Sequence, residues 1–167
     1  MEVVSAYIGL GSNLQSPIAQ VERALVELAE LPHSRMIRAS SLYRSAPMVA
    51  DGDLAAQPDY INAVAQIETT LSPHQLLTQL QQLEQQHQRR RERRWGPRSL
   101  DLDLLLYGNE IVVSADLQVP HPGLCERSFV LIPLLEIGPN LRLPDNRMLA
   151  DVVSACSRAG LIAIHNR

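Results

Sequence analysis

The sequence predicts a single α+β domain, on three grounds. The 167 residues are enough for one domain with a buried core, and few for two. Hydrophobic residues make up 46% of the chain and the formal net charge is only −3, a balance typical of a globular and not of a disordered protein. The hydrophobic pattern changes along the chain in the order strand, helix, strand, strand, helix, strand. That order predicts a ferredoxin-like βαββαβ sandwich, with helices on one face of an antiparallel sheet and additions at the C-terminal end.

The first four elements are predicted from the N-terminal part of the chain. A short apolar strand at residues 3–10 leads into a glycine-rich turn at 9–13. An apolar stripe at helical spacing then predicts an amphipathic helix over 17–31. Two strands follow at 35–45 and 60–69, and the second of them alternates clearly between apolar and polar residues.

The remaining elements include the second helix and the last strand of that order. Leucines on one face predict a helix over 73–87, and an apolar run interrupted by two aspartates predicts a strand over 100–107. The connections at 47–58 and 86–97 are long for a compact domain, and connections of this length are commonly lids or binding loops. Three shorter elements complete the prediction: a strand at 110–113 and helices at 129–137 and 149–159.

The strongest chemical signal is an arginine-rich segment that precedes the last strand. Five of the six residues from Arg89 to Arg94 are arginines, and Trp95-Gly96-Pro97-Arg98 follows them. This concentration of positive charge is unfavourable unless an anion neutralises it, and the forked guanidinium group suits terminal phosphate oxygens. All fifteen basic residues are arginines, which excludes the Walker-type NTPases with their P-loop lysine and also excludes a Schiff-base lysine.

Asp101 and Asp103 are the second half of this signal. Residues two apart on a strand project from the same face, about 6–7 Å from each other, so both carboxylates are expected to point at one spot. Two close carboxylates repel each other, and a divalent cation relieves that repulsion. Oxygen ligands that face anionic phosphate select Mg²⁺, which takes the rest of its shell from water and substrate.

Tyr60 and Asn62 are two apart on another predicted strand and therefore share a face. The tyrosine ring offers a flat surface to an aromatic ligand, and the asparagine amide offers both a donor and an acceptor. Tyr60 also fits an ordinary residue on the surface of a sheet. By itself, His121 in its proline-flanked loop is more typical of a surface or packing residue than of a ligand-binding one.

Several other interpretations of these features remain open from the residues alone. The arginines and aspartates also fit a solvated basic loop followed by an edge strand. Gly9-Leu10-Gly11 is similar to the start of a dinucleotide-binding motif, but Leu14 stands where its third glycine belongs. An RNA-binding module would need aromatic residues on the central strands, and the single phenylalanine lies outside them. A nucleotidyltransferase would use the same aspartate pair with Mg²⁺ and release inorganic pyrophosphate.

The composition also limits the expected partners and location. The acidic balance argues against a general nucleic-acid binder. Cys125 and Cys156 are too few and too isolated for a disulfide framework, so we expect two reduced thiols. The first residues lack a basic leader region, and no segment approaches the roughly 20 apolar residues that a membrane span requires. We therefore expect a soluble cytoplasmic protein with neither a membrane nor a nucleic-acid partner.

The segment 94–103, Arg-Trp-Gly-Pro-Arg-Ser-Leu-Asp-Leu-Asp, closely resembles the signature of the 6-hydroxymethyl-7,8-dihydropterin pyrophosphokinase family. The resemblance covers nearly the whole chain, from Tyr7 to about Asp145. It implies one domain over 1–167, acting as a monomeric diphosphotransferase of folate biosynthesis. The pterin hydroxymethyl oxygen would attack the β-phosphorus of ATP in line, and AMP would depart. The cofactor implied is Mg²⁺, as two ions held by the two aspartates.

The resemblance also implies roles for individual residues. The implied catalytic residues are Arg89, Arg98, Asp101 and Asp103. The implied pterin-binding residues are Asn13, Ser45, Ala46, Met48, Tyr60, Asn62, Trp95 and Phe129. The implied ATP-binding residues are Gln81, Glu84, Arg91, Arg94, Trp95, Arg98, Leu104, Leu117, Gln118, His121 and Arg127. Three features depart from the family pattern: a longer loop after Met48, Pro122 beside His121, and His87-Gln88 in place of Leu-Gly.

Overall fold

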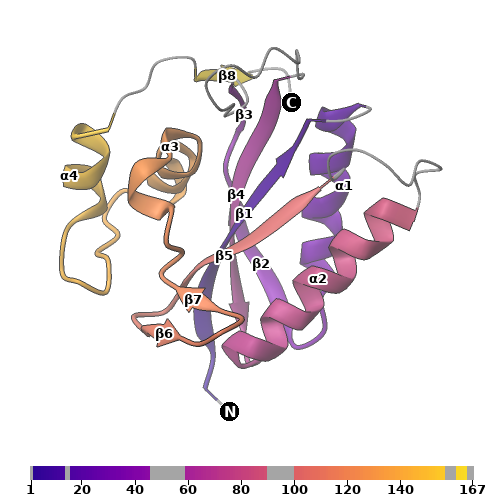
Figure 1. Cartoon of the computed structure of the whole chain (residues 1–167), viewed down its shortest axis with the longest axis horizontal. Coiled ribbons are helices and arrows are strands. Elements are labelled where there is room, and N and C mark those ends of the chain that lie inside the picture. The colour runs from indigo at the N-terminus through magenta and orange to yellow at the C-terminus, as the bar shows by residue number, and fades with distance from the viewer. Residues whose placement is uncertain (1, 14–15, 46–58, 90–99, 157–160, 165–167) are drawn as a thin grey trace.

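The structure, a computed structural model, describes residues 2–13, 16–45, 59–89, 100–156 and 161–164. A six-stranded antiparallel sheet with the order β5-β1-β4-β3-β8 forms its centre, and β2 pairs with β4 off this path (Figure 1). The strands are β1 (Val4–Ser12), β2 (Ser34–Ala39), β3 (Leu42–Ser45), β4 (Tyr60–Thr69), β5 (Asp101–Tyr107) and β8 (Ile162–Ile164). The predicted α+β class and antiparallel sheet are confirmed.

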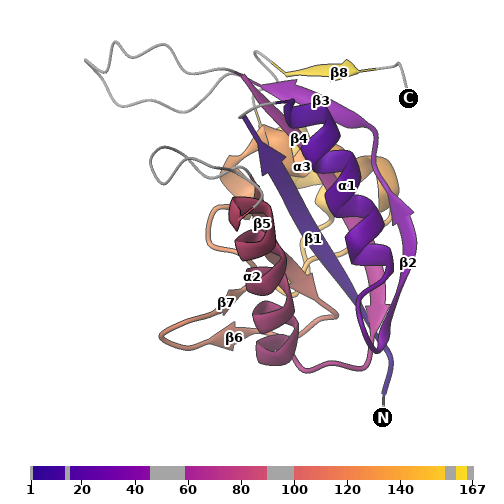
Figure 2. The same ribbon diagram turned by 90° about the vertical axis from the view of Figure 1, so that its right-hand side faces the viewer.

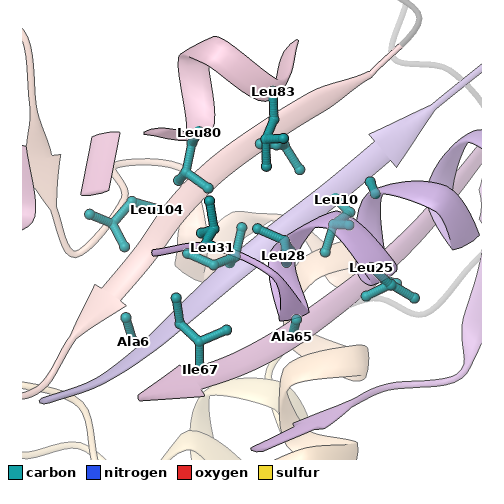
Figure 3. Close-up of a cluster of buried hydrophobic side chains, with 14 of the residues drawn as sticks. Ala6, Leu10, Leu25, Leu28, Leu31, Ala65, Ile67, Leu80, Leu83 and Leu104 are labelled. Carbon is teal, nitrogen blue, oxygen red and sulfur yellow. The ribbon is translucent and has the colours of Figure 1, made fainter. Parts of the chain in front are cut away.

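One face of the sheet is covered by α1 (Pro17–Ala29) and α2 (Pro73–Arg89), which Figure 2 shows in front of the strands. Each helix begins with a proline, whose fixed φ angle is already helical. A residue at this position has no intrahelical acceptor for its N–H, so the N–H that proline lacks is not missed. The leucines spaced along each helix point into one apolar cluster with the sheet (Figure 3). This cluster includes Ala6, Leu10, Leu25, Leu28, Leu31, Ala65, Ile67, Leu80, Leu83 and Leu104.

The other face of the sheet carries α3 (Ser128–Ile137) and α4 (Leu149–Ser154), which lie on the opposite side of the sheet from α1 and α2 in Figure 1. These helices bury a second apolar cluster against Tyr7, Val64 and Leu105. The expectation of helices on one face therefore holds for α1 and α2 alone. The C-terminal helices α3 and α4 form a third layer, whereas the C-terminal strand β8 joins the sheet.

Alternation along β1 explains how one strand serves both clusters. Ala6, Ile8 and Leu10 point into the cluster under α1 and α2, whereas Tyr7 points into the cluster under α3. Gly9 and Gly11 lie on the Tyr7 side, opposite Asp103 and Asp101 of β5 respectively. The predicted turn at 9–13 is therefore wrong, since both glycines lie inside a strand that continues to Ser12.

The last turn of α2 is tied to α1 by His87, whose side chain is fully buried. Its Nδ1 atom lies 2.6 Å from Gln20 Oε1, and its Nε2 atom lies 2.5 Å from Glu27 Oε1. His87 continues the row of buried residues that begins with Leu76 and Leu80. These contacts hold the C-terminal end of α2 in place, where the arginine-rich segment of the sequence begins.

The structure differs from the predicted elements in several places. The strand predicted at 35–45 is two strands, because Ser40 turns aside to bond the β4 backbone: Val64 N donates to Ser40 Oγ at 2.9 Å, and Ser40 N donates to Val64 O at 2.8 Å. The predicted strand at 110–113 is only β6 (Val112–Val113). The predicted helix at 149–159 corresponds to the shorter helix α4, which ends at Ser154. The prediction omitted β7 (Gln118–Val119), the 3₁₀ turn η1 (Leu124–Glu126) and β8.

None of the helices in the described ranges is both long and apolar enough to cross a membrane.

Candidate active site

The register of the central strands brings the candidate residues into one row. Gly11 of β1 pairs with Asn62 of β4 on one side and with Asp101 of β5 on the other. Directly paired residues of antiparallel strands project from the same face. A Cβ atom at Gly11 would lie 3.4 Å from Asn62 Oδ1 and 3.8 Å from Tyr60 Cδ1. The missing side chain therefore leaves a hollow between the amide and the carboxylate.

This hollow is a pocket of about 200 Å³ between the sheet and the start of α3. Its lining residues are Gly9, Leu10, Gly11, Ser45, Tyr60, Asn62, Ala63, Asp101, Asp103, Arg127, Phe129 and Val130. The structure thus brings together residues that the sequence predicted for the pterin site and residues predicted for the metal site. Gly9, Gly11 and Val130 were not predicted, although the Gly-x-Gly spacing was visible in the sequence.

Asn62 is held in one orientation within the pocket. Its Nδ2 atom donates a hydrogen bond of 2.7 Å to Ser45 Oγ, and the side chain is almost fully buried, with 4% of Asn62 exposed. An asparagine amide carries two N–H groups and one acceptor oxygen. One N–H group is used by Ser45, so the second N–H and the oxygen remain the groups with which Asn62 could read a ligand edge.

Tyr60 and Phe129 supply the aromatic surfaces of the pocket, from β4 and α3 respectively. Burial raises the pKa of the Tyr60 hydroxyl, and the nearby Asp101 carboxylate raises it further. The hydroxyl therefore stays protonated and neutral at physiological pH. The guanidinium carbon of Arg127 lies 5.9 Å from the centre of the Phe129 ring, a cation–π contact that orients both groups.

Asp101 and Asp103 both line this pocket, and the strand between them is fixed from the opposite face. The Leu102 N–H donates a hydrogen bond of 2.8 Å to Glu84 Oε2 of α2. On the edge strand β5 this N–H points away from β1, so the carboxylate satisfies a donor that the sheet leaves open. Glu84, which the resemblance implied for the ATP site, thus binds the backbone of the strand that carries the two aspartates.

A second pocket of about 320 Å³ lies between α2, β5 and the segment 114–122. Its lining residues are Leu77, Leu102, Asp103, Leu104, Ser114, Ala115, Asp116, Leu117, Gln118, His121 and Pro122. Leu104, Leu117, Gln118 and His121 were predicted for the ATP site. Asp103 lines both pockets and so stands at their junction.

His121 faces Asp103 with a defined tautomer. Its Nδ1 accepts a hydrogen bond of 3.1 Å from the Gly123 N–H, so the neutral ring carries its proton on Nε2. Nε2 lies 3.9 Å from Asp103 Oδ1. Burial lowers the pKa of His121 and the Arg127 charge lowers it further, whereas Asp103 acts in the opposite direction. The ring is therefore a neutral donor directed at the junction of the pockets.

Arg127 reaches this region because Gly123 has no side chain. A Cβ atom at Gly123 would lie 2.6 Å from Arg127 Nε and 2.8 Å from Arg127 Cζ, which is closer than atoms can pack. Gly123 therefore leaves the space that the guanidinium group occupies, and Arg127 is brought over Phe129 at the edge of the first pocket. The sequence analysis did not single out Gly123.

The other predicted residues lie elsewhere or outside the described ranges. Asn13 is buried just after β1 and does not line the described pocket, and Gln81 is exposed on α2. Arg89 ends α2, but its side chain is outside the described part of the chain. The predicted residues that lie wholly outside the described ranges are Ala46, Met48, Arg91, Arg94, Trp95 and Arg98. Most of the predicted loops at 47–58 and 86–97 lie there too.

The described residues contain no cluster of three or more histidine, cysteine, aspartate or glutamate side chains arranged to hold a metal ion. The aspartate pair offers two oxygen ligand groups, and 44% of the Asp103 side chain is open to solvent. Mg²⁺ is commonly bound by one or two carboxylates, with waters and substrate phosphates completing its octahedron. The donor set fits such an ion, and does not fit a closed structural metal site.

Comparison with protein families gives one clear result. A family model described as 7,8-dihydro-6-hydroxymethylpterin-pyrophosphokinase (HPPK) matches residues 7–139. A protein of Haemophilus influenzae named 2-amino-4-hydroxy-6-hydroxymethyldihydropteridine pyrophosphokinase is 46% identical over 151 residues, which cover 90% of this chain and 92% of the relative. A protein of the same name from Pseudomonas aeruginosa is 43% identical over 155 residues, covering 93% of each chain.

Similar solved structures include crystal structures of Plasmodium falciparum HPPK-DHPS. The A437G variant with STZ-DHP has a TM-score of 0.71 at 12% identity, and the match covers 92% of this chain and 45% of that one. The wild-type protein with pteroate has a TM-score of 0.71, again at 12% identity, covering 92% of this chain and 42% of that one. This chain therefore spans less than half of those longer chains, and at such low identity the likeness shows the fold alone.

Proposed function

This chain belongs to the 7,8-dihydro-6-hydroxymethylpterin-pyrophosphokinase (HPPK) family, and we propose that it transfers the pyrophosphoryl group of ATP to 6-hydroxymethyl-7,8-dihydropterin and releases AMP. One observation carries the proposal within the structure: Asp103 lines both pockets. A transfer between two bound molecules needs its reacting groups at such a junction. We also propose that residues 1–167 form one domain that acts as a monomer in the cytoplasm.

The first pocket suits the pterin. A flat bicyclic ring would lie between Tyr60 and Phe129, which come from the sheet and from the helix that covers it. The Asn62 amide, held by Ser45, would pair with the donors and acceptors of the pyrimidinone edge. A ring without those groups would leave the buried amide unsatisfied, which is the physical basis of specificity here.

The second pocket suits the nucleotide. Leu104 and Leu117 offer an apolar surface to the adenine, and Asp103 and His121 lie at the end where the pocket meets the pterin site. The Nε2–H group of His121 can donate to a phosphate oxygen at this end. Arg127 brings a positive charge to the same edge of the first pocket.

Asp101 and Asp103 would hold Mg²⁺, proposed as two ions, which when bound neutralise phosphate charge and orient the transferred group. The protein groups do the rest by position. The pterin hydroxymethyl oxygen, held at the junction, forms a bond to the β-phosphorus, the bond from that phosphorus to the oxygen bridging it to the α-phosphorus breaks, and AMP leaves with that oxygen. Arg89, Arg91, Arg94 and Arg98 are proposed to bind the phosphate oxygens. We assign no general base for the hydroxyl proton.

Product analysis tests this proposal directly. The purified protein is incubated with Mg²⁺, 6-hydroxymethyl-7,8-dihydropterin and ATP labelled in the adenine ring and at the γ-phosphate. Pyrophosphoryl transfer yields labelled AMP and a pterin that carries the γ-label. Release of free labelled pyrophosphate would favour a nucleotidyltransferase instead. Absence of turnover, with binding retained, would favour a non-catalytic module and contradict the proposal.

A further inference from the structure

Glu136, near the end of α3, binds the sheet at a point away from the candidate active site. We propose that Glu136 is a positioning residue: by binding Ser41 and Tyr43 it sets the rotation of α3 about its own axis, and so the place of Phe129 in the first pocket. This inference rests on the proposed function, because the affected ligand is the pterin. It adds a residue that tunes pterin affinity without touching the ring.

The contacts of Glu136 are numerous for one side chain. Tyr43 Oη donates a hydrogen bond of 2.6 Å to Glu136 Oε1. The Ser41 N–H lies 3.1 Å from Oε1 and 3.0 Å from Oε2, and Ser41 Oγ donates to Oε2 at 3.0 Å. Hydrogen bonds to an ionised acceptor are about twice as strong as neutral ones, so this cluster is a firm attachment of α3.

Helix geometry connects Glu136 to the pocket. Phe129 and Glu136 are seven residues apart on α3, close to two full turns, so they share a face and lie about 10 Å apart along the axis. A rotation of the helix that moves one of these side chains across the sheet therefore moves the other in the same sense. Holding Glu136 at Tyr43 consequently limits where Phe129 can lie.

The rest of the contact between α3 and the sheet is less directional. The buried residues of α3 are Val130, Leu131, Pro133, Leu134 and Ile137, and the apolar cluster on this face also contains Val64 and Leu105. Apolar burial is non-directional, and a smooth apolar face tolerates small rotations better than a hydrogen-bonded one. Apart from the Glu136 cluster, Arg38 Nη1 donates to the Ile137 carbonyl at 3.1 Å, which fixes the end of the helix but no side chain on it.

Tyr43 also connects the attachment to the opposite wall of the pocket. It pairs directly with Asn62 across β3 and β4, so both side chains project from the α3 face of the sheet. Asn62 in turn is bonded to Ser45, two residues beyond Tyr43 on the same strand. The Glu136–Tyr43 hydrogen bond thus spans the helix that carries the aromatic wall and the strand pair that carries the amide.

The test compares pterin affinity in Glu136→Gln and Tyr43→Phe with that of the wild type. Both substitutions keep the shape of the side chain and weaken the attachment. We expect the Kd of 6-hydroxymethyl-7,8-dihydropterin, measured by calorimetry with a non-hydrolysable ATP analogue present, to rise about 5- to 20-fold. The Kd of the analogue alone should stay within about twofold, because none of the described residues that line the second pocket belongs to α3.

Glu68→Gln is the matched control, since Glu68 binds Arg35 at an exposed site on β2 and β4 outside both pockets. Its pterin Kd should equal that of the wild type. A merely structural role for Glu136 would lower the melting temperature and the active fraction while leaving the pterin Kd of the folded protein unchanged. That result in both variants would overturn the inference.

A double-mutant cycle identifies the route of the effect. If Glu136 acts through Phe129, then Phe129→Ala combined with Glu136→Gln binds pterin as Phe129→Ala does alone. Independent, additive losses would contradict the proposed route. Failure of the wild type to bind pterin would instead defeat the proposed function, so the two failures are distinguishable.

Discussion

The two faces of the sheet are built from the same strands and filled in opposite ways. Under α1 and α2, the β1 residues Ala6, Ile8 and Leu10 join a continuous apolar cluster. On the other face, near the start of α3, β1 has glycines in place of side chains, and its neighbours bear Asn62, Asp101 and Asp103 around a pocket. One face thus provides the stability that permits the other to keep an unfilled, charged hollow.

The largest expected effect is on the charged face. Asp103→Asn should lower kcat about 10³-fold, because it removes a charge at the junction of the pockets where phosphate charge develops. The melting temperature should change little, since the side chain is partly open to solvent. Rates of AMP formation and thermal unfolding measure the two quantities. Asp151→Asn, at an exposed position on α4, is the matched control, and a fully active Asp103→Asn enzyme would refute the assignment.

A substitution on the apolar face should have the reverse effect, lowering stability while leaving ligand binding unchanged. Leu28→Ala removes a side chain that is 0% exposed in the cluster under α1, and should lower the free energy of unfolding by about 3 kcal/mol through lost burial and a cavity. Denaturant titration measures the loss, and Val26→Ala on the exposed side of α1 is the control. The pterin Kd of the folded variant should match the wild type. A weakened pterin Kd would show that the two faces are not independent.

Gly11→Ala should separate stability from binding most clearly. The new methyl group would make only ordinary contact with Asn62, so the strand should keep its stability within about 0.5 kcal/mol. The same group fills part of the hollow and should raise the pterin Kd about tenfold, roughly 1.4 kcal/mol. Calorimetry and denaturant titration report the two effects, and unchanged pterin affinity would mean that the ligand does not approach Gly11.

The smallest expected effect concerns His121 and pH. Its folded-state pKa lies below the ordinary value of 6.5, so below that pH the unfolded chain binds more protons than the folded one. The free energy of unfolding should therefore fall as the pH drops through 6.5. His121→Gln should show a smaller fall between pH 7.5 and pH 5.5 than the wild type in urea titrations. A larger fall in the variant would reverse the assigned direction of the shift.

Local periodicity was enough to predict the layer that stabilises the fold. The stripe on α1, the leucines of α2 and the alternation of β4 each arise from residues that are close in sequence, so the pattern indicates the element. The break between β2 and β3 depends instead on Ser40 bonding Val64 of β4, which lies 24 residues further along the chain. A periodicity window of about 11–18 residues is too short to contain both partners of that contact.

The glycines of β1 show the same limit at the candidate site. Gly-x-Gly predicts a turn from local conformational preference, whereas pairing with Asn62 and Asp103 keeps both glycines in the strand. The spacing of the two aspartates was sufficient to predict their common face, because strand geometry alone determines it. Phe129 and Arg127 were expected near the pocket only through the family resemblance, since α3 is joined to the sheet by tertiary packing.

The central claim is that Asp101 and Asp103 jointly bind Mg²⁺ at the junction of the nucleotide and pterin sites. Calorimetric titration of a non-hydrolysable ATP analogue, with and without Mg²⁺, into the wild type and Asp103→Asn tests it most directly. We predict that Mg²⁺ lowers the Kd of the analogue for the wild type by more than about tenfold. For Asp103→Asn the decrease in Kd should be much smaller, because the variant lacks one of the two carboxylate charges that bind the ion. An equal gain from Mg²⁺ in both proteins would contradict the account.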